Sequence, residues 1–412
     1  MRRRMATRFL ALGFCMLAAA LPASDAFTTP LAEQADPQME LRGVFDLASL
    51  TQLPDSKGAS FGHLTLIPYL NYDTDYTDNA TRVRTSPKTD FILETEPGLH
   101  ARYSPRETVS VALDYEFGWH DYALNTLKAY DSNRADAEVK FSRLGFEGLS
   151  LTLSDDFIQT SNVSPLENEI ASDARFDSNI GEERLQYAFN RFRISEDFSY
   201  TFEHYSDAPF NKSDFVVYSG TFDTGWQWIP QRLEIFGETT GSRTLFNVAP
   251  QTDFDTYTFQ AGLRGSYWKL KFNVGAGYNF ANPLNVHGET GDPSLSAKVS
   301  YQATSRISAD LTASRAFQAG VRTGASLDTD LAASVNMQVP SRGKLTLSYT
   351  RNLSDRRSGD YELSVAYTTH FEYKLQRHTA LNFDFTRAVR TSDVRSDNFV
   401  DDEVKVGFRL TF

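Results

Sequence analysis

The sequence predicts an all-β protein, a transmembrane antiparallel β-barrel of about 18 strands (16–20) with short periplasmic turns and longer extracellular loops. Three observations predict this fold. From Gly62 to Phe412, stretches of about 10–16 residues alternate apolar and polar side chains between turn-forming clusters. Beyond the N-terminus no run of about 18 apolar residues occurs, as a membrane-spanning helix would need. Short and long connections between the stretches alternate, as they do in outer-membrane barrels.

The N-terminus has the pattern of a secretory signal peptide. Four arginines among the first eight residues precede an apolar stretch, Phe9–Leu21, and small residues follow up to Ala26. The stretch is too short for a membrane anchor, so we expect cleavage near Ala26, with residues 1–26 removed. Cys15 is the only cysteine and lies inside this segment, so the mature chain has no thiol.

Residues 27–61 lack the alternation of apolar and polar residues that runs through residues 62–412. They contain Pro30, Pro37 and Pro54 and no sustained period, apart from one short helix expected around Val44–Leu50. We interpret them as a periplasmic N-terminal tail in front of a barrel that covers residues 62–412. The net charge of −12 argues against a nucleic acid partner.

The stretch Val109–His120 shows the strand pattern most clearly. Its odd positions are Val, Val, Leu, Tyr, Phe and Trp, and its even positions are Ser, Ala, Asp, Glu, Gly and His. Such alternation places apolar residues on the lipid side and polar residues in the lumen. The predicted strands begin near residues 62, 88, 107, 132, 147, 180, 194, 212, 230, 252, 268, 293, 305, 327, 343, 359, 376 and 398.

The connections predict the orientation. Tight turns are expected at 104–106, 229–231, 267–269 and 340–343, and longer loops near 160–177, 240–254, 281–292 and 389–400. A soluble β-sandwich or propeller is the alternative, but it would have shorter strands or blade repeats of about 40–50 residues. The observed stretches are long enough to cross a bilayer at a tilt.

The last strand ends on an aromatic residue. Val404, Val406, Phe408, Leu410 and Phe412 share one face. This ending resembles the signal that outer-membrane barrels present to the barrel assembly machinery, so we take Phe408, Leu410 and Phe412 as an assembly signal. The alternative is a β-protein that ends on phenylalanine by chance.

The first predicted hairpin carries a narrower resemblance. Leu66-Ile67-Pro68-Tyr69 leads through an acidic Asp-Asn loop to Thr89-Asp90-Phe91-Ile92 and then to Glu96-Pro97-Gly98-Leu99. This order resembles the putative β-barrel porin 2 family. The resemblance implies the outer membrane of a Gram-negative bacterium and an association with exopolysaccharide export, with a polysaccharide export complex as a partner.

Three strands share a pattern ending in arginine. Arg315, Arg351 and Arg387 lie 36 residues apart and fall on the lipid-facing side by parity, toward the long loops. There they are placed to bind lipopolysaccharide phosphates at the membrane interface. The alternative is an interfacial arginine that only reaches water, or a bulge that turns it inward.

Parity places many carboxylates in the lumen, which predicts a passage that favours cations and neutral polar solutes. The alternative is that these charges pair across strands. The predicted 160–177 loop carries four more carboxylates, Glu167, Glu169, Asp173 and Asp177, which add negative charge to the lumen if it folds inward. The candidate selectivity residues are Asp90, Glu94, Glu96, Asp114, Glu116, Glu138, Glu167, Glu169 and Asp173.

The sequence predicts neither an enzyme nor a cofactor. Asp73, Asp75 and Asp78 form an acidic loop by our interpretation, but Asp78 occupies the position where a calcium-hand loop has glycine, so no metal is expected. The histidines are scattered over different strands, without a hydrolase motif or metal-ligand spacing.

A barrel of this size leaves an aqueous passage. The function we place first is export of a secreted polysaccharide. The alternatives are a passive porin for small hydrophilic solutes, or a structural or surface-interaction barrel with a blocked lumen.

Overall fold

The computed structural model describes residues 58–82, 86–145, 147–160, 175–205, 214–247, 253–284, 290–320, 324–339, 342–356, 361–393 and 398–412. The predicted signal peptide and the helix expected near Val44–Leu50 lie outside these residues, as do Glu167, Glu169 and Asp173. Within the described residues, no helix is long and apolar enough to cross a membrane.

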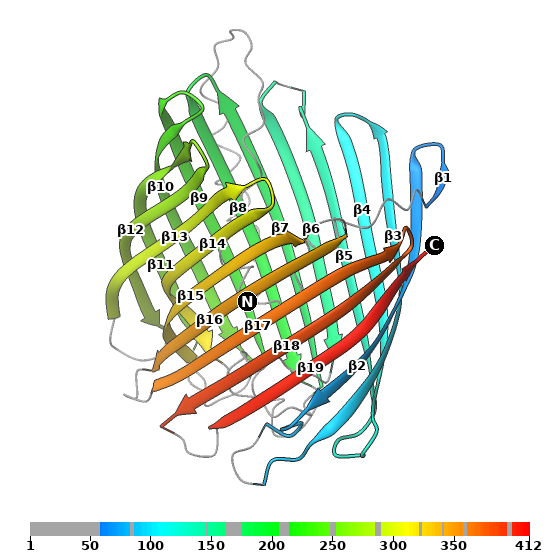
Figure 1. Ribbon diagram of the computed structural model, residues 1–412. Coiled ribbons are helices and arrows are strands. Elements are labelled where there is room, and N and C mark those ends of the chain that lie inside the picture. Colours follow the sequence, from blue (N-terminus) through cyan, green and yellow to red (C-terminus); the bar gives the residue numbers. More distant parts are fainter. Residues whose placement is uncertain are drawn as a thin grey trace. The chain divides into compact units, whose positions relative to one another are not determined.

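The described chain forms one closed antiparallel β-barrel of 18 strands, β2 to β19, which confirms the predicted fold (Figure 1). Each strand pairs with the next, and β19 pairs with β2 to close the ring. A short additional strand, β1, pairs with the start of β2. The strands are β1 (Ala59–Phe61), β2 (Leu64–Thr77), β3 (Asp90–Arg106), β4 (Val109–Tyr122), β5 (Tyr130–Ser142), β6 (Leu149–Thr160), β7 (Phe176–Phe189), β8 (Phe192–Tyr205), β9 (Phe215–Ile229), β10 (Leu233–Phe246), β11 (Phe254–Tyr267), β12 (Leu270–Pro283), β13 (Thr290–Thr304), β14 (Ile307–Gly320), β15 (Gly324–Val339), β16 (Gly343–Arg356), β17 (Tyr361–Gln376), β18 (Thr379–Ser392) and β19 (Phe399–Thr411).

The predicted alternation sets the two faces of the sheet. On β4 the odd residues Leu113, Tyr115 and Trp119 are exposed on the outer surface, whereas His120 and Tyr122 are buried on the lumen side. Exposed Leu, Phe, Tyr and Trp side chains recur at outward positions around the whole barrel. The apolar side chains therefore form an outer belt that suits lipid, and the lumen keeps the polar ones.

Connections are short at one end of the barrel and mostly longer at the other, and we name these the short-turn end and the long-loop end. β7 and β8, for example, are joined by two residues, of which Asn190 has the positive φ (52°) that suits a tight hairpin. The observed strands begin within four residues of the predicted starts, the largest difference being 176 against 180.

Three predicted loops are shorter than expected. β10 continues to Phe246, β12 to Pro283 and β18 to Ser392, and β13 already begins at Thr290, so the loops near 240–254, 281–292 and 389–400 shrink. The last part of β10 is polar on both faces, so the sequence pattern predicted a loop there. It is paired all the same, because Arg243 Nε binds Asp255 Oδ1 at 2.7 Å and the hydroxyls of Ser242 and Thr256 lie 2.6 Å apart.

The outer face is not apolar everywhere. A chain of hydrogen bonds runs across β4 to β7, in which the Tyr115 hydroxyl donates to Asn133 Oδ1 (2.9 Å), Asn133 Nδ2 to Gln159 Oε1 (3.1 Å) and Gln159 Nε2 to Asp177 Oδ1 (2.8 Å). These bonds satisfy polar groups that lipid cannot. Glu183 and Glu196 are also exposed at outward positions, and nothing in the described residues explains them.

Candidate functional site

The inward faces of β19, β2, β3 and β4 form what we call the charged wall. Residues that face each other across these strands lie in rows, because the four strands are paired in register. One row contains Gly407, Asp73, Glu94 and His120, and the next contains Arg409, Asn71, Glu96 and Gly118. The wall thus joins residues from the two ends of the barrel sequence.

Lys405 is the central cation of the charged wall. Its ammonium contacts the carboxylate of Glu94 and lies 3.9 Å from Asp73 Oδ2 and 3.7 Å from Asp75 Oδ2. One ammonium therefore serves three carboxylates, all of which are nearly buried. Carboxylates therefore outnumber cations on this side of the lumen.

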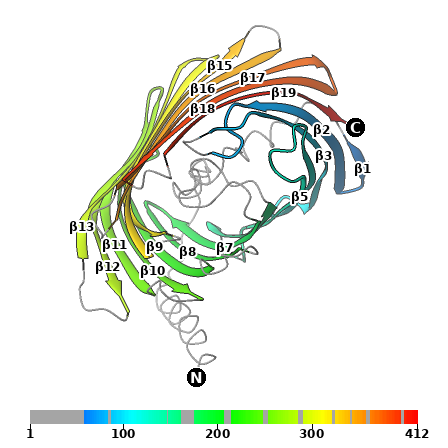
Figure 2. The same cartoon turned by 90° about the horizontal axis from the view of Figure 1, so that it is seen from below.

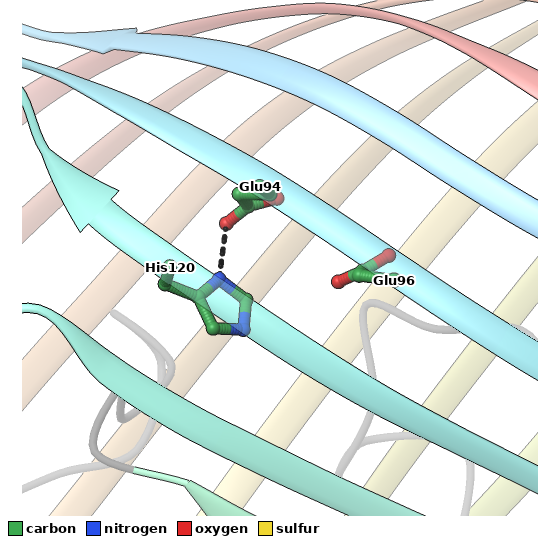
Figure 3. A group of neighbouring side chains, drawn as sticks. All are labelled: Glu94, Glu96 and His120. Atoms are coloured by element: carbon green, nitrogen blue, oxygen red, sulfur yellow. Dashed lines mark hydrogen bonds and ion pairs between the residues drawn. The ribbon is translucent and has the colours of Figure 1, made fainter.

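Glu94, Glu96 and His120 lie near one another on the charged wall (Figure 3), and the Glu94 carboxylate also contacts Lys405. Glu94 and Glu96 come from β3, and His120 comes from β4, directly opposite Glu94. His120 Nδ1 lies 3.0 Å from Glu94 Oε1, and Nε2 lies 2.9 Å from the Ser132 hydroxyl. One ligand atom from each of the three side chains falls within 4.8 Å of the others, so the group could hold a metal ion.

Two glycines allow side chains to lie flat against this wall. At Gly118 a Cβ atom would crowd His120 Nε2 and the Ser132 hydroxyl, so glycine is what lets the imidazole reach Ser132. At Gly98 a Cβ atom would overlap the ring of Tyr69. The absence of side chains here is therefore part of the site.

The Tyr69 ring crosses Gly98 to reach the next strand. Its hydroxyl donates to Glu116 Oε2 at 3.1 Å, and Asn71 Nδ2 donates to the same oxygen at 3.1 Å and to Glu96 Oε2 at 3.4 Å. Arg409 Nε donates to Asn71 Oδ1 at 2.7 Å. Glu96 and Glu116 are thus held by neutral donors.

The other predicted lumen carboxylates have different surroundings. Asp90 is 0% exposed, and it accepts hydrogen bonds from Leu124 N (2.8 Å) and Thr126 N (3.0 Å), so it fixes the loop that follows β4. Asp114 pairs with His100. Glu138 lies 3.1 Å from Lys140 Nζ. Their role in selectivity stays a prediction.

Charge pairing, the alternative left open by the sequence, occurs elsewhere on the lumen face. Arg193 and Arg264 both contact Asp223 at 2.8 Å, and both also contact Glu234, at 3.3 and 2.6 Å. Two arginines are matched there by two carboxylates. Pairing therefore neutralises the wall around β8–β11, whereas carboxylates outnumber cations around Lys405.

The inward faces of β13 to β16, which are separated from β19 only by β17 and β18, form what we call the hydroxyl wall (Figure 2). Small hydroxyl side chains dominate it, and Lys298, Asp310, Asp328, Asp330 and Lys344 are spaced among them. The hydroxyl residues are Ser294, Ser296, Ser300, Ser308, Thr312, Ser314, Ser326, Ser334, Thr346, Ser348, Thr350 and Ser354.

The three predicted arginines occupy outward register positions. Arg315 is paired with Leu295, Arg351 with Val365 and Arg387 with Tyr367. Two of them also bind carboxylates of their own chain, because Arg315 lies 2.7 Å from Asp292 Oδ1 and Arg387 lies 3.4 Å from Asp402 Oδ2. Binding of lipopolysaccharide phosphate by these arginines stays a prediction.

Sequence reasoning missed part of this site. Asp73 and Asp75 were assigned to an acidic loop, but they lie inside β2 and face the lumen. The signal was present, since Asn71, Asp73, Asp75 and Thr77 keep a period of two. The partners of Lys405 could not be read from spacing, because Glu94 is 311 positions away.

At the seam, Phe408 packs on Tyr72 with ring centroids 5.5 Å apart, and Phe412 N donates to Pro68 O at 3.0 Å. These contacts place the predicted terminal signal in the strand that closes the ring. Whether the barrel assembly machinery reads Phe408, Leu410 and Phe412 stays a prediction.

A closed barrel of 18 strands with a polar interior and an apolar outer belt defines a porin-like membrane channel. Residues 54–412 match the family model described as putative beta-barrel porin 2. The chain therefore belongs to that family, as its first hairpin had indicated, and it is an outer-membrane β-barrel. Family and fold indicate a channel that is not an enzyme.

Several solved outer-membrane proteins are similar to the chain. OpdK from Pseudomonas aeruginosa is 10% identical and has a TM-score of 0.46, with 84% of this chain and 99% of that one covered. A BenF-like porin from Pseudomonas fluorescens Pf-5 is 7% identical, with a TM-score of 0.47 and coverage of 84% and 99%. OccAB3 from Acinetobacter baumannii is 10% identical, with a TM-score of 0.44 and coverage of 85% and 100%. No curated protein matches the chain.

The family description names a porin and no polysaccharide. It supports the passive-porin alternative better than the export function that the sequence analysis placed first. Contacts with lipopolysaccharide, the barrel assembly machinery or a polysaccharide export complex stay predictions.

Proposed function

We propose that this protein is a passive porin, which lets small hydrophilic solutes cross the outer membrane and favours cations over anions. The observation that carries the proposal is the composition of the lumen face. Inward positions on all the barrel strands are mainly polar or charged, and a ring of about 18 strands is too wide for side chains to fill.

The cation preference rests on the charged wall. Lys405 is shared among Asp73, Asp75 and Glu94, and Glu96 and Glu116 are held by the neutral donors Asn71 and Tyr69. Excess carboxylates beside an aqueous passage raise the local cation concentration and repel anions. The effect should be strongest at low salt, where screening is weakest.

Planar-bilayer recordings on the purified barrel test the proposal. We expect an ohmic conductance that rises with salt, and a reversal potential in a salt gradient with the sign of a cation-selective channel. Liposome swelling should slow as the sugar offered becomes larger. A folded barrel that gives neither conductance nor swelling would contradict the porin function.

Neutral variants of the charged wall test the selectivity separately. The double variant Glu96→Gln and Glu116→Gln keeps the shape of both side chains and removes two negative charges. We expect its cation preference to fall while its conductance stays measurable. Glu183→Gln, on the outer face, is the matched control and should leave selectivity unchanged. An anion-selective wild-type channel would show that the wall charges do not govern permeation.

A further inference from the structure

The group Glu94, Glu96 and His120 offers the donor atoms of a metal site. Within the described residues it is the only set of three or more His, Cys, Asp or Glu side chains whose ligand atoms come this close. His120 Nδ1 and Glu94 Oε1 are 3.0 Å apart. Ligands at about 2.1 Å from one metal ion lie about 3–4 Å from each other, so this spacing already suits a shared ion.

The surroundings of His120 favour ligation by Nδ1. When Nε2–H donates to the Ser132 hydroxyl at 2.9 Å, the lone pair of Nδ1 points toward Glu94. The ring is also held by stacking on Tyr130, with centroids 4.4 Å apart and planes at 11°. A ligating histidine commonly donates its second ring N–H in this way, and this bond fixes the tautomer and the orientation of the ring.

The two carboxylates are oriented by groups outside the set. The second oxygen of Glu94 contacts the Lys405 ammonium, which leaves Oε1 directed at His120. Asn71 Nδ2 donates to Glu96 Oε2 at 3.4 Å. Glu96 is only half-buried, so it has room for the small torsional change that would complete a three-ligand site.

Other histidines in the barrel lack this arrangement. His370 Nδ1 lies 2.5 Å from Asp384 Oδ1, and His100 pairs with Asp114, but neither pair has a third ligand in the described residues. A His–carboxylate pair alone is therefore a structural feature of this lumen. The third carboxylate distinguishes the group at Glu94.

We propose that Glu94, Glu96 and His120 bind a divalent transition-metal ion such as Zn²⁺ on the wall of the passage. An imidazole with two carboxylates suits Zn²⁺ and its neighbours better than Mg²⁺ or Ca²⁺, which prefer oxygen ligands alone. The proposal rests on the proposed function only in that a water-filled lumen gives the ion access. A water molecule would fill the remaining coordination position.

Isothermal titration of the full-length, detergent-folded barrel with ZnCl₂ tests the site. The protein should carry no polyhistidine tag, because a tag would bind the same ion. We expect one saturable site per chain, which is lost in His120→Asn and in Glu96→Gln. Co²⁺ in place of Zn²⁺ should give visible absorption bands that the same two variants abolish.

Two further variants provide the controls. His370→Asn removes an imidazole from a pair without a third ligand and should leave Zn²⁺ affinity unchanged. Ser132→Ala removes only the acceptor of Nε2–H and should weaken binding by about tenfold, as the loss of an outer-shell partner does. Each variant is first shown to be folded by its heat-modifiable mobility in gel electrophoresis.

Absence of saturable Zn²⁺ binding by the wild-type barrel would overturn the proposal, as would undiminished binding in His120→Asn and Glu96→Gln. Ca²⁺ binding as strong as Zn²⁺ binding, and unchanged in His120→Asn, would show a site made of carboxylates alone and would also overturn the proposal. Because titration needs no conduction, a barrel that binds Zn²⁺ but does not conduct would contradict the proposed function alone.

Discussion

The charged wall and the hydroxyl wall face the same passage but are built differently. On the charged wall, Asp73, Asp75 and Glu94 are less than 10% exposed, and Lys405 is the cation that all three contact. On the hydroxyl wall most side chains are small and neutral, and the buried Asp330 accepts hydrogen bonds from the neutral side chains of Ser314 and Asn352. The charged wall therefore depends on a shared cation, whereas the hydroxyl wall is held by neutral hydrogen bonds, each of which contributes about 1 kcal/mol.

The difference follows from where each wall lies in the barrel. The charged wall contains the seam, where β19 pairs with β2 over a sequence separation of more than 300 residues. Its network forms only when the ring closes, because Lys405 and Arg409 come from the last strand. The hydroxyl wall is made of consecutive hairpins and needs no such closure.

The largest effect is expected from loss of the terminal residue at the seam. Deleting Phe412 removes the aromatic residue that ends β19 and its hydrogen bond to Pro68 O. An unclosed last strand would leave a free sheet edge. We expect most of the protein to be degraded before insertion, measured as heat-modifiable barrel in outer-membrane fractions. Phe412→Tyr keeps an aromatic ring and should insert normally; normal levels of the deletion variant would contradict the role of this residue.

The next effect separates the two walls by the loss of one lysine. Lys405→Met leaves three buried carboxylates without their shared cation, which should lower the free energy of unfolding by about 3 kcal/mol. Lys344→Met, on the hydroxyl wall, should change it by less than about 0.5 kcal/mol. Urea unfolding of the two variants in lipid vesicles, followed by tryptophan fluorescence, measures both. Equal destabilisation would show that Lys405 contributes no more to the stability of the barrel than Lys344 does.

A smaller effect is expected at Gly98, where the Tyr69 ring crosses β3. A methyl group at this position overlaps the ring and should cost about 1–3 kcal/mol, the usual penalty of overpacking. Gly220→Ala, where the space around the new Cβ atom is open, is the matched control and should be nearly neutral or stabilising. The same unfolding measurement applies, and two indistinguishable variants would mean that Tyr69 moves aside freely.

Much of the fold could be predicted because a barrel strand repeats every two residues. Val109–His120 and the final strand fixed the inward and outward faces correctly, and parity placed Glu94, Glu96 and Glu116 toward the lumen. The polar end of β10 could not be recognised in this way, because its pairing depends on Arg243 meeting Asp255 on the neighbouring strand.

The contacts of the candidate site depend on register and closure, which spacing does not contain. His120 meets Glu94 because β3 and β4 pair at that residue, and Lys405 meets Glu94 because the ring closes. Asp90 could not be recognised as a loop-fixing residue, because its partners Leu124 and Thr126 belong to a turn that it helps to form.

The smallest effect concerns charge added to the hydroxyl wall. Ser296→Asp and Ser348→Asp replace neutral hydroxyls by carboxylates at inward positions of β13 and β16. If the excess charge of the charged wall sets selectivity through the field in the passage, carboxylates on the hydroxyl wall should increase the cation preference severalfold at low salt. Ser296→Asn and Ser348→Asn have the same size and should leave the reversal potential unchanged. The same comparison distinguishes selectivity set by the electric field in the passage from selectivity set by direct binding of ions to side chains. If selectivity requires ions to bind the Glu94 and Glu96 side chains themselves, new carboxylates on the hydroxyl wall will change conductance but not the ratio of cation to anion permeability.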